Sequence, residues 1–264
     1  MIRYLVSDLD GTLLQKDETI ASSDIEAILR FKEAHNHFFV ASGRPCDFMS
    51  RLEELGVKAE YMFGSTGAVI SDGTKEEVVG AMDKDIAKRL SELLDSLEEV
   101  DYVIDARKFC GFYAKDVYGH FRRHMRTARI LDVRRPSEFF KNDEAVLKFF
   151  VICKDDEVAD LCAKAIDKEF SLELKSYHAD RGCLEVVKKD TGKWPAIKKF
   201  LDEKGIDKSE VACIGDEGND IEMIENCGFG FAMANAKDEV KAKAKKVVAS
   251  VAEAIAYLGE VKDV

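Results

Sequence analysis

A short apolar run that ends in two aspartates opens the chain and constrains its fold more than any other feature. Ile2–Ser7 has the length and composition of a β-strand, and Asp8, Asp10 and Gly11 follow it directly. Alternate residues of an extended backbone project to the same side, so both carboxylates are expected on one side, and Gly11 permits a turn after them. Acidic groups at the carboxyl end of a strand lie where α/β sheets usually form their sites. The pattern therefore predicts an α/β fold with an acidic site after its first strand.

The next fifty residues alternate between helical and extended patterns. Ser23–Glu26 has the sequence of a capping box, which predicts the start of a helix. His37–Ala41 is a continuous apolar run, typical of a strand that is covered on both faces. Pro45 predicts the beginning of a second helix, Gly56 its end, and residues 61–63 a further strand. This order predicts a β–α–β unit.

The C-terminal third repeats the same alternation. Pro195 predicts the opening of a helix that closes at Gly205, and residues 211–214 have the composition of a buried strand. Residues 218–225 are predicted to be helical, residues 229–233 to form a strand, and two short helices to end the chain. Alternating strands and helices predict an α/β fold with a Rossmann-like, mostly parallel sheet and helices on both faces.

The middle of the chain follows a different pattern. Longer strands and helices succeed one another there without a low-complexity linker, which favours an inserted α+β cap domain. We therefore expect a Rossmann-like core formed by residues 1–82 and 183–264, and an inserted cap formed by residues 83–182. The predicted cap strands are residues 102–105, 109–114, 146–153 and 171–177, and its helices are residues 86–96, 117–126 and 156–170.

Charge and composition limit the partners of the chain. Hydrophobic residues make up 46% and charged residues 34%, and the formal net charge is −11. An acidic chain repels nucleic-acid backbones and anionic lipid, so neither is an expected partner. No apolar segment has the length of a membrane span, and the N-terminus becomes acidic at Asp8, before a signal peptide could form. We expect a cytoplasmic protein, a monomer or small homo-oligomer, that acts on a small molecule.

Asp8 and Asp10 suit phosphoryl transfer. One aspartate can attack phosphorus and form an acyl phosphate, while the other transfers the proton of the leaving group. The alternative is a strand that simply ends in an Asp-Gly turn. A carboxylate that approaches a phosphate dianion at about 4 Å, with an effective dielectric near 20, meets a repulsion of order 8 kcal/mol. The hypothesis therefore requires a divalent cation and a lysine elsewhere in the chain.

The segment after the predicted strand 211–214 can supply the cation site. Asp216, Asn219 and Asp220 follow Gly215, and hard carboxylate oxygens suit Mg²⁺. The carboxyl ends of parallel strands meet at one edge of a sheet, so these acids are expected beside Asp8. The alternative is that Asp216 or Asn219 caps the next helix.

Two further segments can bind the phosphate. Ser42 and Gly43 follow the strand 37–41 and precede a helix, where a hydroxyl and a backbone amide can hold phosphate oxygens. A serine cap at a strand-to-helix turn is the alternative there. Lys193 precedes Pro195 and therefore lies near the positive end of a helix dipole, although most lysines are solvated surface groups.

Taken together, these segments resemble the haloacid dehalogenase-like hydrolase superfamily. The resemblance rests on Asp8-x-Asp10-Gly11-Thr12, Ser42-Gly43-Arg44, Lys193 and Gly215-Asp216-x-x-Asn219-Asp220, and it spans residues 1–80 and 183–257. A cap between the second and third motifs is similar to the Cof-type branch, whose cap belongs to class IIB. The resemblance implies a Rossmann-like core, a cap that closes over the substrate, and a small phosphorylated metabolite as substrate, such as a sugar phosphate.

The resemblance also implies a role for each motif residue. Asp8 would be the nucleophile and Asp10 the general acid/base. The Asp8 carboxylate, the Asp10 backbone carbonyl and Asp216 would hold Mg²⁺. Ser42, Gly43, Lys193 and Asn219 would bind the phosphoryl group, with Asp220 in support.

Three departures from the branch stand out. Thr66 occupies the position of an asparagine in Gly64–Ala68, and Trp194-Pro195 replaces a common glycine after the lysine. The tail, residues 247–258, lacks the usual asparagine and glycine. None of these changes removes a catalytic group.

Other functions remain open at this stage. A phosphomutase on the same scaffold would pass the phosphoryl group to another hydroxyl, and a non-catalytic phosphate-binding module would keep only the binding groups. His120 and His124 have zinc-ligand spacing, but Phe121 stands where the metalloprotease pattern needs glutamate, so a surface helix is favoured. A cluster of arginines between residues 122 and 135 is expected to be a solvated face; the alternative is that it favours a substrate with a second anionic group.

Overall fold

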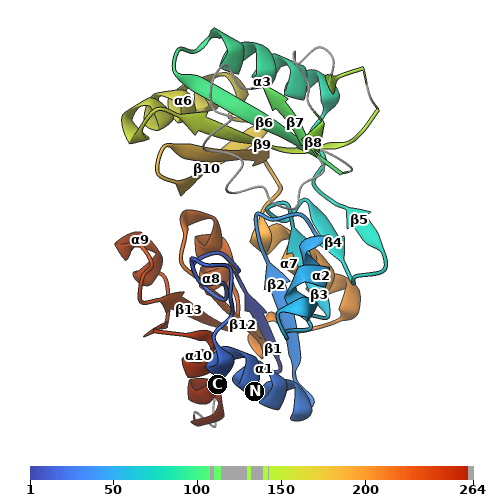
Figure 1. Cartoon of the computed structure of the whole chain (residues 1–264), viewed down its shortest axis with the longest axis vertical. Helices are drawn as coiled ribbons and strands as arrows, with labels where there is room; N and C mark the ends of the chain where they lie inside the picture. Colours follow the sequence, from blue (N-terminus) through green and yellow to red (C-terminus); the bar gives the residue numbers. More distant parts are fainter. Residues whose placement is uncertain (108–109, 114–129, 132–138, 142, 261–264) are drawn as a thin grey trace. The chain divides into compact units, whose positions relative to one another are not determined.

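The computed structural model describes residues 1–107, 110–113, 130–131, 139–141 and 143–260, and the chain divides into two compact units. The first unit comprises residues 1–77 and 192–264, and the second comprises residues 78–191 (Figure 1). The strand β11 (Cys183–Lys188) pairs with strands of the second unit, so the second boundary lies at residue 191 and not at residue 182. A short apolar strand can extend either sheet, so the sequence of residues 183–188 does not show which of the two sheets they join.

The first unit is built on an eight-stranded sheet, in the order β14-β13-β12-β1-β2-β3-β4-β5. The five pairs from β14 to β3 are parallel, and β3 and β4 are antiparallel. The predicted α/β class with a parallel core is therefore confirmed. The strands are β1 (Tyr4–Ser7), β2 (His37–Ala41), β3 (Tyr61–Gly64), β4 (Val69–Ser71), β5 (Glu76–Val78), β12 (Val211–Gly215), β13 (Phe229–Met233) and β14 (Lys246–Val248).

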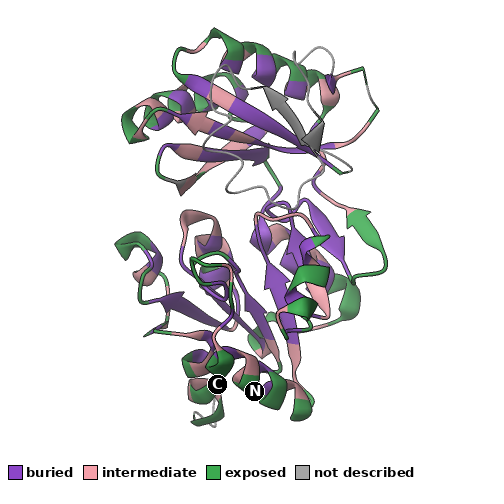
Figure 2. Cartoon of the chain, viewed as in Figure 1, coloured by how far each residue is buried: buried purple, intermediate pink, exposed green. Residues whose placement is uncertain are grey.

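Burial explains why the central strands read as continuous apolar runs. In β2 the side chains of Phe38 and Val40 are fully buried and Phe39 is 3% exposed, so both faces of the strand are covered. Phe200 of α7 (Lys193–Lys204) packs edge-on against Phe39, with 5.4 Å between ring centroids. Figure 2 shows the same burial along the central strands of this sheet. A core of this kind fixes the strand ends from which the site is built.

The helices of the first unit begin and end close to the predicted positions, with three corrections. The helix α1 (Ser22–Glu33) has Ala21 as its N-cap and no side-chain cap, so the predicted capping box is absent. Asp24, which lies between the two residues of the expected box, accepts a hydrogen bond from the Ala252 amide in α10 (Val251–Glu260). The remaining helices are α2 (Phe48–Glu54), α8 (Ile221–Asn226), α9 (Asp238–Lys241) and the 3₁₀ turns η1 (Lys208–Glu210) and η2 (Gly218–Asp220).

The other two corrections concern α2 and α8. The second helix begins at Phe48 and not at Pro45, because residues 45–47 form a turn before it. The helix predicted over residues 218–225 divides into η2 and α8, and Glu217 and Asp220 form a capping box at the start of η2. As predicted, α7 ends at Gly205.

The second unit contains a six-stranded sheet in the order β10-β11-β9-β6-β7-β8. The side chains of α3 (Lys84–Ser96) and α6 (Asp156–Phe170) share one hydrophobic core with Phe149 and Leu184 from the sheet. The predicted helix 117–126, the pair His120 and His124 and the arginine cluster lie outside the described residues. The strands are β6 (Val100–Ala106), β7 (Cys110–Tyr113), β8 (Ile130–Leu131), β9 (Val146–Cys153), β10 (Leu174–Asp180) and β11.

The longest helix among the described residues is α6, with 15 residues. A helix that crosses a bilayer needs about 20 predominantly apolar residues. No described helix combines the length and the apolar composition that crossing requires.

Candidate active site

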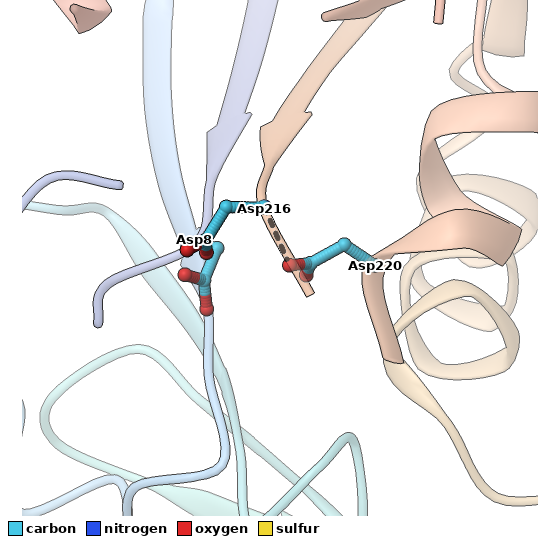
Figure 3. A group of neighbouring side chains, drawn as sticks. All are labelled: Asp8, Asp216 and Asp220. Atoms are coloured by element: carbon cyan, nitrogen blue, oxygen red, sulfur yellow. Dashed lines mark hydrogen bonds between the residues drawn. The ribbon is translucent and has the colours of Figure 1, made fainter. Parts of the chain in front are cut away.

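Two neighbouring parallel strands bring the first acids of the site together. β1 pairs with β12, with Ser7 opposite Ile214, and the Asp8 amide continues the ladder by donating to the Ile214 carbonyl at 2.9 Å. Asp8 and Asp216 therefore leave the same edge of the sheet, although 208 positions of sequence, the difference between their residue numbers, separate them. Figure 3 shows the two carboxyl groups side by side, with Asp220 beyond them.

Asp8, Asp216 and Asp220 form one acidic cluster. Each can offer a carboxylate oxygen such that all three oxygens lie within 4.8 Å of one another. Their residues are 5%, 7% and 0% exposed, so the charges are removed from water. Among the described acids, Asp10 is not part of this group.

Lys193 joins the two ends of the cluster. Its ammonium nitrogen Nζ lies 2.7 Å from Asp8 Oδ1 and 2.6 Å from Asp220 Oδ1, and the residue is 2% exposed. Lys193 is the first residue of α7, and Gly192 before it approaches Gly67 closely. A Cβ on Gly67, whose φ is +81°, would lie 2.0 Å from the Gly192 carbonyl oxygen. Only glycine at residue 67 allows the loop to position the lysine in this way.

Asp220 fixes the loop that carries Asp216. Its Oδ2 accepts hydrogen bonds from the amides of Asp216 and Glu217, each at 3.0 Å, and the first of these is the dashed line in Figure 3. Its Oδ1 is bound to Lys193. Both oxygens of Asp220 are thus engaged, so its role is to hold Lys193 and the loop in place.

Asp216 is oriented by two side chains, one of which the sequence reasoning missed. Thr12 donates to Asp216 Oδ1 at 3.1 Å, and Asn235 donates to Asp216 Oδ2 at 3.0 Å and to the Gly11 carbonyl at 3.0 Å. Gly11 has a φ of +84°, and a Cβ there would lie 2.3 Å from Asp216 Oδ2. The signal for Asn235 was its place just beyond β13, the strand next to β12.

Asp10 lies outside the acidic cluster and contacts Arg44. The guanidinium of Arg44 donates from Nε to Asp10 Oδ2 at 2.9 Å and from Nη2 to Asp10 Oδ1 at 2.6 Å. The chain turns directly after Asp8, so Asp10 lies on a turn and not on the extended strand that the alternation assumed. The Leu14 amide donates to the Leu9 carbonyl at 2.7 Å, which closes that turn.

The remaining predicted residues lie at strand ends next to the cluster. Ser42 follows β2, the neighbour of β1, and is fully buried. Its Oγ accepts a hydrogen bond from the Arg44 amide at 3.1 Å, which is the serine turn considered as the alternative reading. Gly43 forms part of this turn, and Asn219 lies in η2 beside Asp220.

Comparison with known proteins assigns the fold and these motifs to a family. The family model of the haloacid dehalogenase-like hydrolases matches residues 5–258. The chain belongs to this hydrolase family. The resemblance read from the motifs is thereby confirmed, as is the expectation that the chain is an enzyme.

Two relatives align with almost the whole length of this hydrolase. A 5-amino-6-(5-phospho-D-ribitylamino)uracil phosphatase of Escherichia coli (strain K12) is 28% identical over 248 residues, which cover 92% of this chain and 89% of that protein. A pyridoxal phosphate phosphatase of the same organism is 28% identical over 261 residues, covering 93% of each chain.

Solved structures of two further proteins share the fold. A subclass IIB sugar phosphatase superposes with a TM-score of 0.82 at 22% identity, covering 98% of this chain and 100% of its own. A haloacid dehalogenase-like hydrolase from B. subtilis superposes with a TM-score of 0.84 at 22% identity, covering 97% of this chain and 100% of its own. The Cof-type branch with a class IIB cap, expected from the motif order, is confirmed by the family match and this shared fold.

Two of the departures from the family pattern are buried beside the site. Thr66 is fully buried with a φ of +57°, and its amide donates to the Ser42 carbonyl at 3.0 Å. Ser65 before it has a φ of +49°, so two consecutive non-glycine residues adopt the left-handed region that disfavours a β-branched side chain. Trp194, the second residue of α7, is 7% exposed. In this hydrolase the loop 64–67, which bonds to Ser42 and packs against Gly192, is therefore itself strained at Ser65 and Thr66.

The site of the hydrolase carries more negative charge than its lysine compensates. Burial raises the pKa of the Asp8 carboxyl well above its ordinary value, and the charges of Asp220 and Asp216 raise it further, against the opposing charge of Lys193. Burial, followed by the charge of Asp220, raises the pKa of Asp216 to about 7. Burial alone would lower the pKa of Lys193, but the carboxylates of Asp220 and Asp8 outweigh it and raise that pKa.

This excess of buried negative charge fits a divalent cation. The donors are hard carboxylate oxygens within 4.8 Å of one another, which is the ligand type that Mg²⁺ prefers. Asp220 accepts two amides at Oδ2 and binds Lys193 at Oδ1, whereas each oxygen of Asp216 accepts a single side-chain hydrogen bond and Asp8 binds Lys193 through Oδ1. Asp8 and Asp216 are therefore the members of the cluster with more capacity to coordinate a cation.

Proposed function

We propose that this hydrolase is a Mg²⁺-dependent phosphatase that removes phosphate from a small phosphorylated metabolite, such as a sugar phosphate, through an aspartyl-phosphate on Asp8. The observation that carries the proposal is the position of the Lys193 ammonium between Asp8 and Asp220, with Asp216 in the same oxygen cluster. A carboxylate that attacks a phosphate dianion must overcome the repulsion between the two negative charges. A buried cationic group and metal-binding groups beside that carboxylate reduce this repulsion.

The electrostatic requirement is large. The repulsion between one carboxylate and a phosphate dianion is of order 8 kcal/mol at about 4 Å and an effective dielectric near 20. Lys193 opposes part of it through direct contact with Asp8. Bound Mg²⁺, held by the carboxylates of Asp8 and Asp216 and the backbone carbonyl of Asp10, would neutralise the rest and polarise the phosphoryl group.

The residues of the chain then have distinct tasks. An oxygen of Asp8 attacks phosphorus, the bond from phosphorus to the leaving oxygen breaks, and Asp10 gives that oxygen its proton. In the second half, Asp10 takes a proton from water, the water oxygen attacks phosphorus, and the bond to Asp8 breaks to release inorganic phosphate. Ser42, Gly43, Lys193 and Asn219 bind the phosphoryl oxygens, and Asp220 keeps Lys193 in place.

The substrate class follows from the relatives and the composition. The two Escherichia coli relatives are named for small phosphomonoesters, a phosphoribitylamino-uracil and pyridoxal phosphate. A net charge of −11 disfavours polyanionic macromolecules. We infer that the second unit, residues 78–191, supplies substrate specificity, and that the enzyme acts in the cytoplasm as a monomer or small homo-oligomer.

A panel of phosphorylated metabolites and p-nitrophenyl phosphate, assayed with Mg²⁺ and with EDTA, tests the proposal. We expect inorganic phosphate release that requires Mg²⁺ and is abolished in Asp8→Asn. Rapid quenching followed by mass spectrometry should find one added phosphoryl group on the peptide that contains Asp8. Positional isomers of a sugar phosphate in place of free phosphate would identify a phosphomutase. Turnover by Asp8→Asn equal to the parent would refute the mechanism.

A further inference from the structure

Arg44 binds the Asp10 carboxylate with two parallel hydrogen bonds. Arg44 Nε lies 2.9 Å from Asp10 Oδ2, and Nη2 lies 2.6 Å from Asp10 Oδ1. Two parallel bonds from the planar guanidinium determine both the position and the plane of a carboxylate, whereas a single bond leaves it free to rotate.

The arginine is itself held from several sides. Its guanidinium carbon lies 4.4 Å from the centre of the Phe48 ring, and Nη2 lies 3.4 Å from Glu18 Oε1. Its backbone amide is bound to Ser42 Oγ at 3.1 Å, and its carbonyl accepts from the Ser65 amide at 2.8 Å. The side chain is only 20% exposed. Arg44 is therefore a fixed support, tied to the same loops that carry the proposed phosphate-binding residues.

Asp10, by contrast, is not fixed by packing. Its side chain is 55% exposed, and it lies on the turn that follows Asp8. An exposed aspartate on a turn has several rotamers, and confining it to one costs conformational entropy that its partner must offset. A proton donor is effective only when it is held within hydrogen-bond reach of the leaving oxygen.

We propose that Arg44 is a positioning residue that holds the Asp10 carboxyl group in the orientation needed for proton transfer to and from the leaving group. This inference rests on the proposed function, in which Asp10 is the general acid/base. Arg44 acts through Asp10, so its removal should lower kcat/KM, which reports formation of the aspartyl-phosphate, mainly for substrates whose departure needs a proton. The later attack of water is the same step for every substrate. Lysine at residue 44 keeps the charge but loses the two-pronged geometry.

Two aryl esters that differ in leaving-group basicity separate this role from others. Phenyl phosphate and p-nitrophenyl phosphate are similar in shape, but phenoxide is much more basic than p-nitrophenoxide and depends more on protonation. For Arg44→Gln we expect kcat/KM on phenyl phosphate to fall at least about 10-fold, and kcat/KM on p-nitrophenyl phosphate to change by less than about threefold. Arg44→Lys should show the same selective loss to a lesser degree.

A double-mutant comparison strengthens the test. Asp10→Asn should lose kcat/KM on phenyl phosphate selectively, and adding Arg44→Gln to it should cause no further selective loss, because both changes disable one unit. Glu18→Gln is the matched control, since it alters the other carboxylate beside Arg44 and leaves the contact with Asp10 in place. The ratio of kcat/KM on the two esters in Glu18→Gln should stay within about twofold of the parent.

The outcomes distinguish this inference from the proposed function. If Asp10→Asn shows no leaving-group selectivity, the acid/base role of Asp10 fails, and the inference falls with it. If Asp10→Asn is selective while Arg44→Gln lowers kcat/KM on both esters by the same factor, Arg44 binds phosphate or supports the fold, and the positioning role is refuted. Increased turnover in Arg44→Gln would also refute it. Should Arg44→Gln fail to fold, Arg44→Lys provides the same comparison.

Discussion

The ammonium nitrogen of Lys193 lies 2.7 Å from Asp8 Oδ1, although 185 positions separate the two residues in the chain. The contact exists because β1 ends at the edge of the sheet where α7 begins, and because Asp220 holds the lysine from its other side at 2.6 Å. This relation makes Lys193 a structural as well as a chemical part of the site.

Removing the charge of Lys193 should destabilise the protein. Lys193→Met keeps most of the side-chain volume but leaves Asp8 and Asp220 buried without a cation, which costs about 3–5 kcal/mol when one partner of a buried pair is lost. We expect the free energy of unfolding in urea at pH 7 to fall by that order. Lys198→Met, on the same helix but in an exposed pair with Asp202, is the control and should change stability by less than about 1 kcal/mol. Equal losses in the two variants would contradict the prediction.

Asn235 should control metal affinity through Asp216. Its amide bonds to Asp216 Oδ2 and to the Gly11 carbonyl orient one proposed ligand, and loss of such a partner lowers metal affinity about 10–100-fold. Calorimetric titration of Asn235→Ala with Mg²⁺, without substrate, measures this directly. Asn226→Ala removes a comparable side-chain bond to a helix carbonyl at the end of α8 and should leave the Kd unchanged. An unaltered Kd in Asn235→Ala would show that the loop positions Asp216 by itself.

The stability of the metal-free enzyme should fall as pH rises from about 4 to about 7. The pKa of Asp216 is about 7 in the folded protein, against 3.8 as its ordinary value, so between these values the folded state binds more protons than the unfolded state. Stability then decreases with pH, by an amount of order 4 kcal/mol for a shift of this size. The raised pKa of Asp8 acts in the same direction.

Unfolding in urea with EDTA, repeated at several pH values, measures this slope. Asp216→Asn cannot titrate at residue 216 and should show a shallower decline between pH 4 and 7. Adding Mg²⁺ should stabilise the parent more at pH 8 than at pH 5, because protons and the cation compete for the same oxygens. Metal-free protein that gains stability over this range, with the same slope in Asp216→Asn, would contradict the assignment of the raised pKa.

Gly67→Ala should damage the site and the fold together. Its φ of +81° disfavours any side chain, and a Cβ would lie 2.0 Å from the Gly192 carbonyl oxygen and 3.0 Å from the Lys193 amide. Gly205 has a φ of +67°, but no atom lies within 4 Å of a Cβ placed there. The control Gly205→Ala therefore measures only the conformational cost of alanine, about 1–2 kcal/mol. We expect the loss in the free energy of unfolding in urea to be larger for Gly67→Ala than for Gly205→Ala by at least about 2 kcal/mol. Equal values would mean that the loop relaxes without cost.

The predictions from sequence succeeded where they depended on local patterns. β2, β9, β13 and α6 have the predicted bounds, because continuous apolar runs and caps are local signals. They failed where a local pattern allowed two outcomes. The capping box expected of Ser23 and Glu26 is absent, because α1 already begins at Ser22, with Ala21 as its N-cap. In the same way, β11 could have joined either sheet, and only pairing with β9 and β10 placed it in the second unit.

The sequence by itself determined the α/β class, the family and the meeting of Asp8, Lys193 and Asp216, because strand order and the edge of a parallel sheet follow from periodicity and motif spacing. Only the tertiary structure decided that Asp10 turns toward Arg44, that Asn235 orients Asp216, and that Asp220 is fully engaged by Lys193 and two amides. These features depend on the conformation of one turn and on contacts between residues as many as 224 positions apart. No local pattern of side chains encodes such contacts, since they form only when the sheet has brought the loops together.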